Sequence, residues 1–131
     1  MLSETLNYLS DEMATALSIV VTKGFPVWGR PPLVPPAMGI EVYEIDPGIS
    51  SRIGQRLARK SPTWRLSLFG RNETELCSLA DLLLDWCQAH ESTVIATQRV
   101  DCRLTAVRRH IPETAALQEQ YGMEFFLTIT W

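Results

Sequence analysis

The sequence predicts an α+β fold, a two-layer sandwich of about four mostly antiparallel strands with two helices packed on one face. Two stretches repeat apolar residues every three or four positions, as amphipathic helices do, and four stretches alternate apolar and polar residues, as half-buried strands do. These stretches follow one another in the order α-β-β-α-β-β. With 131 residues, the chain fits a single domain, residues 1–131.

The first helix is predicted to run from Leu2 to about Val20. Its apolar stripe at helical spacing consists of Leu2, Leu6, Leu9, Met13, Ala16, Leu17 and Val20. Ser3 is a suitable N-cap, and Gly24 is placed to end the helix. We therefore expect one face of this helix to lie on the core.

Residues 24–39 contain five prolines and three glycines. Because each proline fixes φ and removes a backbone donor, this stretch predicts an extended crossing segment rather than a helix or a central strand. Trp28 and Val34 are its expected anchors on the body of the fold.

The four alternating stretches are residues 38–45, 63–69, 99–107 and 121–131. In the third of them, the side chains expected to point inward are Val100, Cys102, Leu104 and Ala106. The face expected to point away from the helices is mixed, because Tyr43, Ile45 and Phe126 lie there among Thr, Arg and Glu. Such a face is either solvated or in contact with a partner.

The second helix is predicted over residues 72–90, with Asn72 as N-cap and acidic residues in the first turn. Its buried stripe consists of Leu76, Leu79, Ala80, Leu83 and Cys87, widened by Leu82, Leu84 and Trp86. Because so much of the circumference is apolar, we expect this helix to contact both the sheet and the first helix.

Composition excludes several classes of protein. Apolar residues make up 46% and charged residues 21%, as in ordinary globular proteins, and the net charge of -3 does not suit a general nucleic-acid binder. No apolar run approaches the roughly 18 residues that span a bilayer, and the first 13 residues carry no Lys or Arg, unlike a secretory signal. Three cysteines without a C-x-x-C pair indicate a reducing compartment. We expect a soluble protein made in the cytoplasm.

The sequence contains no nucleophile elbow, phosphate-binding loop or zinc-protease motif. The residues that a zinc site would use are Cys87, His90, Cys102 and His110. Both cysteines fall on predicted core faces, where a free Cys behaves as a small hydrophobic residue. Asp81 and Asp85 are expected on the solvated side of the second helix, without the burial that a paired-carboxylate site needs. We therefore predict no enzyme activity, no metal and no cofactor.

Residues 46–62 separate the first two strands and predict an unusually long, flexible loop. Residues 46–66 contain one acid and five cations, a balance of +4, whereas the rest of the chain carries -7. The five cations are Arg52, Arg56, Arg59, Lys60 and Arg65. The segment is therefore either a solvated loop or a docking arm for an acidic surface or a phosphate.

The stretch W-x-L-x-L-F-G-R-N-E-T-E-L, residues 64–76, joins a strand directly to a helix with an acidic first turn. With the N-terminal helix, the proline-rich crossing and the aromatic last strand, it resembles the tail terminator (tail completion) proteins of long-tailed bacteriophages. The likeness covers nearly the whole chain as an order of elements.

The resemblance implies a structural virion protein that caps the head-proximal end of the tail tube as a ring, usually of six subunits. The ring stops tube polymerisation and forms the surface for head attachment. The implied partners are further copies of the chain, the tail tube protein and a head-tail connector protein. DNA would pass through the ring without sequence-specific recognition, no membrane is involved, and assembly takes place in the host cytoplasm.

The resemblance also implies residue roles. The long loop would face the tube or the channel, so that its candidate tube-binding residues are Arg52, Arg56, Arg59 and Lys60. The candidate subunit contacts are the sheet edges and the mixed face around Tyr43, Ile45 and Phe126.

Two other functions stay open from the sequence. One is a head-tail connector or neck subunit in the same virion setting. The other is a small ferredoxin-like ligand-binding regulatory module, which would need a pocket with converging polar groups.

Overall fold

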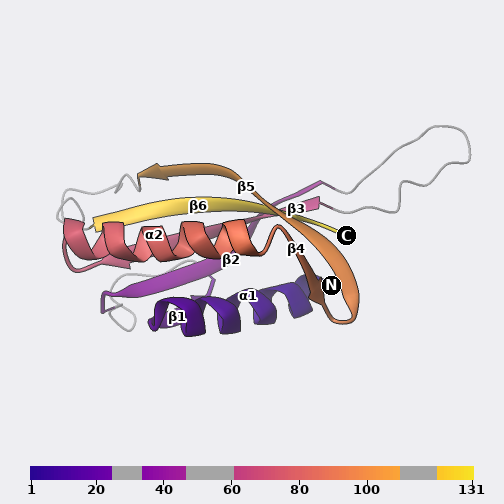
Figure 1. Ribbon diagram of the computed structural model, residues 1–131, viewed down its shortest axis with the longest axis horizontal. Coiled ribbons are helices and arrows are strands. Elements are labelled where there is room, and N and C mark those ends of the chain that lie inside the picture. Colours follow the sequence, from indigo (N-terminus) through magenta and orange to yellow (C-terminus); the bar gives the residue numbers. More distant parts are fainter. Residues whose placement is uncertain (25–33, 47–60, 110–120) are drawn as a thin grey trace, which may run out of the picture.

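A computed structural model of the chain describes residues 1–24, 34–46, 61–109 and 121–131 (Figure 1). Its elements, in chain order, are α1 (Leu2–Leu17), β1 (Val20–Lys23), β2 (Ala37–Asp46), β3 (Ser61–Gly70), α2 (Glu73–Ala89), β4 (Ser92–Ile95), β5 (Gln98–Arg109) and β6 (Tyr121–Thr130).

The strands form one sheet in the order β1-β2-β3-β6-β5-β4. The β1–β2 pair is parallel, and every other neighbouring pair is antiparallel. Both helices lie on one face, and the long strand β5 bends around them (Figure 1). The predicted four-stranded sandwich is therefore wrong, because the chain adds a short strand at each edge and the six-stranded mixed sheet curls into a half-barrel.

Strand β1 takes the place of the last turn predicted for the first helix. The helix ends at Leu17, because Ser18 adopts the left-handed conformation with φ 54° and ψ 47°. The next four residues, 19–22, are all β-branched, which favours a strand. Val20, expected on the buried stripe, is consequently exposed, and Met1 rather than Ser3 is the N-cap.

Strand β4 pairs with β5 through a two-residue turn. Its central residues, Ala96 and Thr97, have φ values of 48° and 66°, as a type I′ turn requires. The hydroxyl groups of Tyr8 in α1 and Thr93 in β4 are hydrogen-bonded at 2.9 Å. The curl of the sheet therefore brings its last strand beside the first helix.

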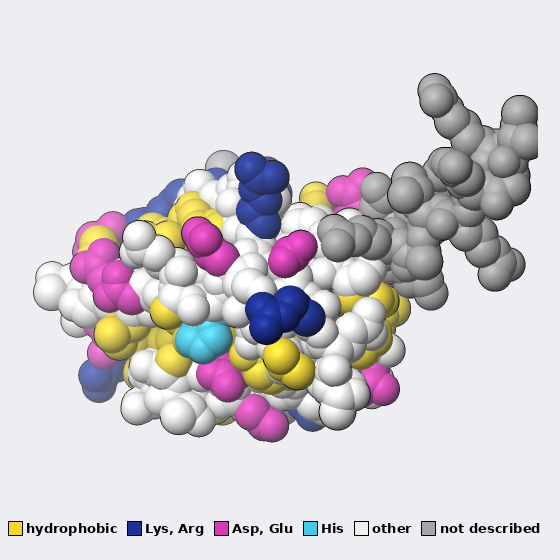
Figure 2. All heavy atoms as spheres, turned by 45° about the vertical axis from the view of Figure 1, so that its right-hand side comes forward, with side chains coloured by type: hydrophobic (Ala, Val, Ile, Leu, Met, Phe, Trp, Pro, Cys, Tyr) yellow, Lys and Arg dark blue, Asp and Glu magenta, His cyan; other side chains and the backbone are white. Residues whose placement is uncertain are grey.

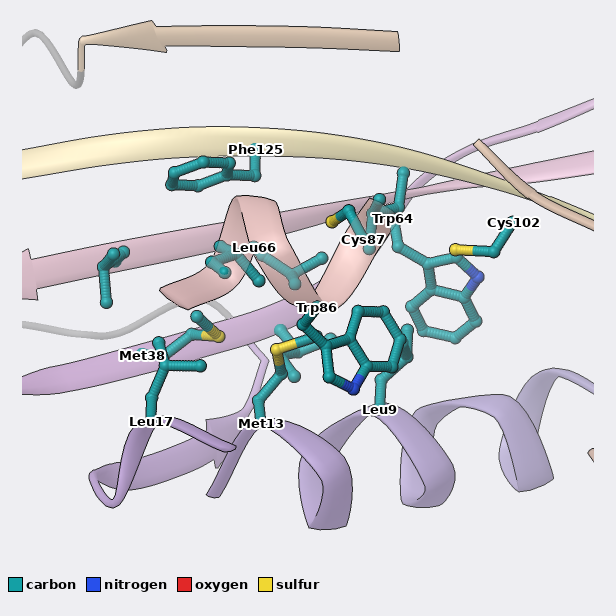
Figure 3. Close-up of a cluster of buried hydrophobic side chains, with 14 of the residues drawn as sticks. Leu9, Met13, Leu17, Met38, Trp64, Leu66, Trp86, Cys87, Cys102 and Phe125 are labelled. Atoms are coloured by element: carbon teal, nitrogen blue, oxygen red, sulfur yellow. The ribbon is translucent and has the colours of Figure 1, made fainter. Parts of the chain in front are cut away.

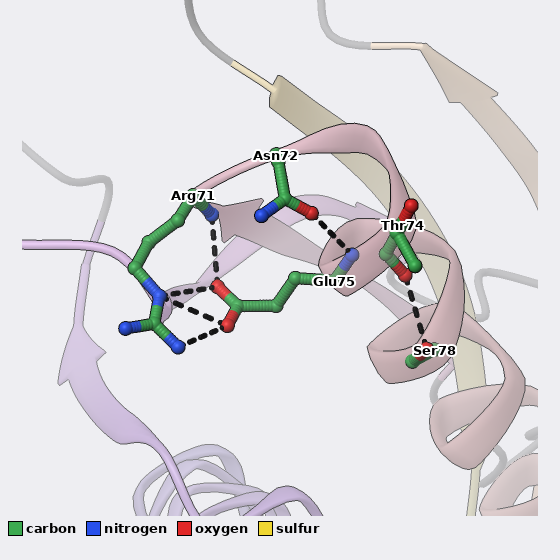
Figure 4. Close-up of polar contacts among 5 residues, drawn as sticks. All are labelled: Arg71, Asn72, Thr74, Glu75 and Ser78. Atoms are coloured by element: carbon green, nitrogen blue, oxygen red, sulfur yellow. Dashed lines mark hydrogen bonds and ion pairs between the residues drawn. The ribbon is translucent and has the colours of Figure 1, made fainter.

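Helix α2 begins at the predicted residue. The Asn72 Oδ1 accepts a hydrogen bond from the Glu75 backbone N–H at 2.8 Å, and the Glu75 carboxylate accepts from the backbone N–H of Arg71 at 2.8 Å and from its guanidinium (Figure 4). A Cβ on Gly70 would lie 2.9 Å from the Leu76 backbone nitrogen. Glycine thus lets β3 run directly into the helix.

The core fills the space between the two helices and the sheet (Figure 3). Among its fully buried side chains are Leu9, Met13, Trp64, Leu66 and Phe125. Helix α2 contacts both the sheet and α1, as predicted, and the Trp86 indole N–H donates to Glu12 of α1 over 3.2 Å. The predicted stripe of α2 is buried, except that Leu82 and Leu84 are exposed. Of the expected anchors of the crossing segment, Val34 is exposed and Trp28 lies outside the described residues.

Two bulges interrupt the sheet on either side of one row of cross-strand partners. The register of β2 with β3 shifts between Val42 and Glu44, and that of β5 with β6 shifts between Leu104 and Ala106. Both shifts begin at one row of cross-strand partners, formed by Val42, Trp64, Leu127 and Leu104. Because a bulge bends its strand and increases the local twist, two bulges that flank one row contribute to the curl.

The bulges also reverse two predicted side-chain directions. Ile45 pairs with Pro62, which lies on the helix side of the sheet, so that Ile45 does not share a face with Tyr43. Ala106 pairs with Phe126 and so lies on the outer face instead of pointing inward. A simple alternation cannot show this, because each bulge adds one residue to the period of two.

Candidate interaction surfaces

The four candidate tube-binding cations, Arg52, Arg56, Arg59 and Lys60, lie outside the described residues. Their flanks are described: Asp46, the last residue of β2, pairs with Ser61, the first residue of β3. The segment 47–60 is therefore inserted between two adjacent strand ends. By sequence it holds those four cations and no acid, in a chain whose net charge is -3.

The outer face of the sheet carries an aromatic cluster, which we define as Tyr43, Arg65, Arg108 and Phe126. The rings of Tyr43 and Phe126 meet edge to face, with centroids 5.2 Å apart at 68°. The Arg108 guanidinium lies 4.6 Å from the Phe126 ring centroid, and that of Arg65 lies 5.1 Å from the Tyr43 centroid. Phe126 is thereby 5% exposed, whereas Tyr43 is 51% exposed. Of these two candidate contact residues, Tyr43 offers the larger surface to a partner.

Carboxylates on the same face hold both arginines of the aromatic cluster. Glu41 accepts a hydrogen bond from Arg65 on the adjacent strand, and Glu124 accepts one from Arg108 over 3.3 Å. Ion pairs between neighbouring strands therefore fix the cations over the rings.

The third candidate contact residue, Ile45, borders a hollow of about 630 Å³ at the end of the sheet from which segment 47–60 departs. The hollow is lined by Met1, Leu2, Ser3, Glu4, Ile45, Pro62 and Trp131. Leu2 and Ile45 are both exposed. This end of the molecule thus combines an apolar hollow with the insertion of the basic segment.

Two stretches of strand have no partner on one side among the described residues. Strand β1 covers only residues 37–40 of β2, which leaves residues 41–46, the β2 edge. Strand β4 covers only residues 98–101 of β5, and residues 103–109 form the β5 edge. Sequence reasoning named sheet edges in general but missed these stretches, because it missed β1 and β4.

A second hollow, of about 610 Å³, lies between α2 and β5 and holds the two buried thiols. It is lined by Leu84, Cys87, Gln88, Glu91, Asp101, Cys102, Arg103 and Leu104. Burial raises the pKa of Cys87 to about 11 and that of Cys102 to about 12. Both thiols are therefore protonated at neutral pH, which makes them weak nucleophiles and weak metal ligands.

Of the two histidines of the hypothetical zinc site, the structure describes His90 alone. The His90 ring stacks on Trp86 at 4.3 Å, and its Nδ1 lies 2.8 Å from the Trp86 carbonyl oxygen. His110 lies outside the described residues. Within the described ranges, no group of three His, Cys, Asp or Glu residues is arranged to hold a metal ion. Asp81 and Asp85 are exposed, as expected.

The described surface seen in Figure 2 carries small hydrophobic patches between charged side chains of both signs. A scan against protein-family models and a search of curated proteins find no match for this chain.

In the part of the chain that the structure describes, no helix has the length and apolar character needed to cross a membrane.

Proposed function

We propose that the protein is a tail terminator of a long-tailed bacteriophage. Copies of the chain form a ring on the head-proximal end of the tail tube, six in the family that it resembles. The ring stops the addition of tube subunits and offers a second surface to the head-tail connector protein. The protein assembles in the host cytoplasm, stays in the virion tail, and acts by surface fit without covalent chemistry or a cofactor.

The observation that carries this proposal is the basic insertion between β2 and β3. Its four cations enter the chain between the paired residues Asp46 and Ser61, in a protein that is otherwise acidic. A cluster of cations opposite in sign to the rest of the chain steers docking to an acidic surface such as the rim of a tube. The residues that carry the resemblance also fold as one continuous unit, since β3 passes into α2 through Gly70.

Termination of a tube requires no reaction. A ring that binds the last tube ring on one face, and presents on its other face a surface that a tube subunit cannot use, ends the polymer. Such a ring is built from head-to-tail contacts that close on themselves. The functional parts are therefore one docking segment and one pair of complementary subunit surfaces.

The test is a polymerisation assay with the cognate tube protein, in which tube lengths are measured by negative-stain electron microscopy. We expect the wild-type chain to cap one end of each tube and to shorten the tubes. The triple variant Arg52→Glu, Arg56→Glu and Arg59→Glu should lose capping, and a variant with Lys at the same three positions should keep it. Capping should also weaken as salt is raised, because the contact is electrostatic.

Tubes of unchanged length in the presence of the wild-type chain would refute the proposal. Electron microscopy of virions with labelled protein gives a second test. A label on the neck, away from the tube end, would favour the connector instead.

A further inference from the structure

We propose that copies of the chain join head to tail, with the β5 edge of one copy added to the β2 edge of the next as antiparallel strands. The closure of such an assembly into a ring rests on the proposed function. The pairing itself rests on the two edges.

The two edges lie at opposite corners of the sheet. Among the described residues, β1 pairs with the first half of β2 and no strand pairs with its second half on that side, whereas β4 pairs with the first half of β5 and no strand pairs with its second half on that side. Because β2 and β5 run in opposite directions in the sheet, a neighbouring copy in the same orientation presents its β5 edge antiparallel to β2. When one sheet is shifted along the strands relative to the other, the unpaired half of β5 lies beside the unpaired half of β2. The short strands β1 and β4 then lie beyond the two ends of this contact.

One antiparallel register matches the two edges on both faces. It places Glu41 opposite Arg108 on the outer face, where the two charges have opposite signs. On the helix side, the register places aliphatic residues opposite one another, in the pairs Val42 with Val107 and Ile45 with Leu104. Opposite charges and aliphatic pairs are the cross-strand combinations that stabilise antiparallel strands.

The bulges lie opposite one another in this register. Tyr43 and Glu44 carry the extra residue of β2, and Thr105 and Ala106 carry that of β5. Since both strands have one extra residue at the same step, the pairing continues beyond the bulges without exchange of faces.

On the helix side of the two edges, the exposed aliphatic side chains are those expected of a buried strand. Val42 is 41% exposed, Ile45 47% and Val107 42%. Open strands are usually protected from further pairing by inward-pointing charges or by proline. Neither edge has a proline, and the helix-side positions of the proposed pairs, Val42, Ile45, Leu104 and Val107, are all aliphatic. A second copy of the chain is therefore the occupant that suits both edges at once.

The test compares three single lysine variants by sedimentation velocity over a range of concentrations. Val42→Lys on the β2 edge and Val107→Lys on the β5 edge should each weaken association of the full chain at least tenfold. Val94→Lys, at an exposed valine of β4 outside the proposed contact, is the matched control and should associate like the wild type. All three should keep the wild-type thermal transition, since the substituted side chains are exposed.

A mixing experiment tests the head-to-tail arrangement. The Val42→Lys chain keeps an intact β5 edge and the Val107→Lys chain keeps an intact β2 edge, so an equimolar mixture should form heterodimers and nothing larger. The double variant Val42→Glu and Val107→Lys should regain association, because the two new charges lie opposite one another.

A wild-type chain that stays monomeric at millimolar concentration would overturn this inference, as would unchanged association of both edge variants. These outcomes are separate from the tube assay. A chain that assembles through these edges but leaves tube length unchanged contradicts only the proposed function, and a chain that shortens tubes while both edge variants still assemble contradicts only the edge pairing.

Discussion

Replacement of Phe126 by alanine should destabilise the isolated subunit. Its ring is 5% exposed although it points away from the helices, because Tyr43 packs edge to face against it and the Arg108 guanidinium lies over it. Phe126→Ala removes the centre of the aromatic cluster and leaves these two side chains without their apolar support.

The magnitude follows from what covers the ring. Loss of a buried phenylalanine typically costs about 3–5 kcal/mol, depending on how far the surroundings collapse into the space. The two side chains that cover the Phe126 ring can move into the vacated space, because Tyr43 is 51% exposed and the Arg108 side chain is 59% exposed. We therefore expect the lower end, about 3 kcal/mol, of which the edge-to-face pair contributes about 1 kcal/mol.

The assay is equilibrium unfolding in urea, under conditions in which the wild type and the variants are monomeric. Phe126→Leu, which keeps most of the apolar volume, should lose less stability than Phe126→Ala. In a double-mutant cycle with Tyr43→Ala, Phe126→Leu should show a coupling energy of about 0.5–1.5 kcal/mol.

An unchanged urea midpoint for Phe126→Ala would refute this reasoning. If that variant also lost self-association, Phe126 would act in the subunit contact rather than in the packing of its own subunit.

Four further predictions concern the fold. Thr97→Gly should raise the free energy of unfolding by about 1 kcal/mol in a thermal melt, because Thr97 has a φ of 66°, which glycine adopts without the steric cost of a Cβ. Gly70→Ala should lower it by about 1–3 kcal/mol in urea unfolding, since the new Cβ would lie 2.9 Å from the Leu76 backbone nitrogen. Alkylation of the native protein at pH 8, followed by mass spectrometry, should modify the exposed Cys77. The buried Cys87 and Cys102 should react only after the protein unfolds. Because burial raises the pKa of these two thiols to about 11 and about 12 from an ordinary value of 9.0, the stability that they contribute is fully present below pH 9 and is lost as the pH rises through 11 to 12.

The long elements could be predicted because their patterns extend over many residues. In α2, the asparagine at position 72 and the apolar residues that follow at helical spacing fix both the start and the buried face. In β3 and β6, the alternation around Trp64 and Phe125 identifies the core face correctly.

The short strands could not be predicted because competing signals were as strong. Val20 continues the helical spacing from Leu17, which extends the predicted helix into the β-branched run at 19–22. The turn before β5 contains Ala96 and Thr97 instead of the Asn-Gly that marks a type I′ hairpin. Without β1 and β4, the composition of the sheet edges could not be inferred.

Of the candidate surfaces, the basic segment could be predicted from the sequence, whereas the face on which Ile45 lies could not. Excess positive charge in segment 47–60 is a property of composition and needs no structure to be seen. The direction of a side chain beyond a bulge depends on the register of its strand. No local sequence pattern predicts the extra residue at Tyr43 or Thr105. Sequence reasoning therefore named Ile45 as a candidate contact residue but placed it on the wrong face.

The two bulges connect the shape of the subunit with its proposed assembly. A bulge in β2 alone would shift the proposed pairing by one residue, and Ile45 would then stand opposite a residue that points to the other face. Because β5 of the neighbouring copy has a bulge opposite that of β2, its Leu104 points to the helix side and lies opposite Ile45 there. The bulges that bend each sheet therefore also keep the two sheets of the proposed pairing in register. Head-to-tail pairing of these edges forms a ring when the rotation from one curved sheet to the next closes on itself, which the proposed function requires.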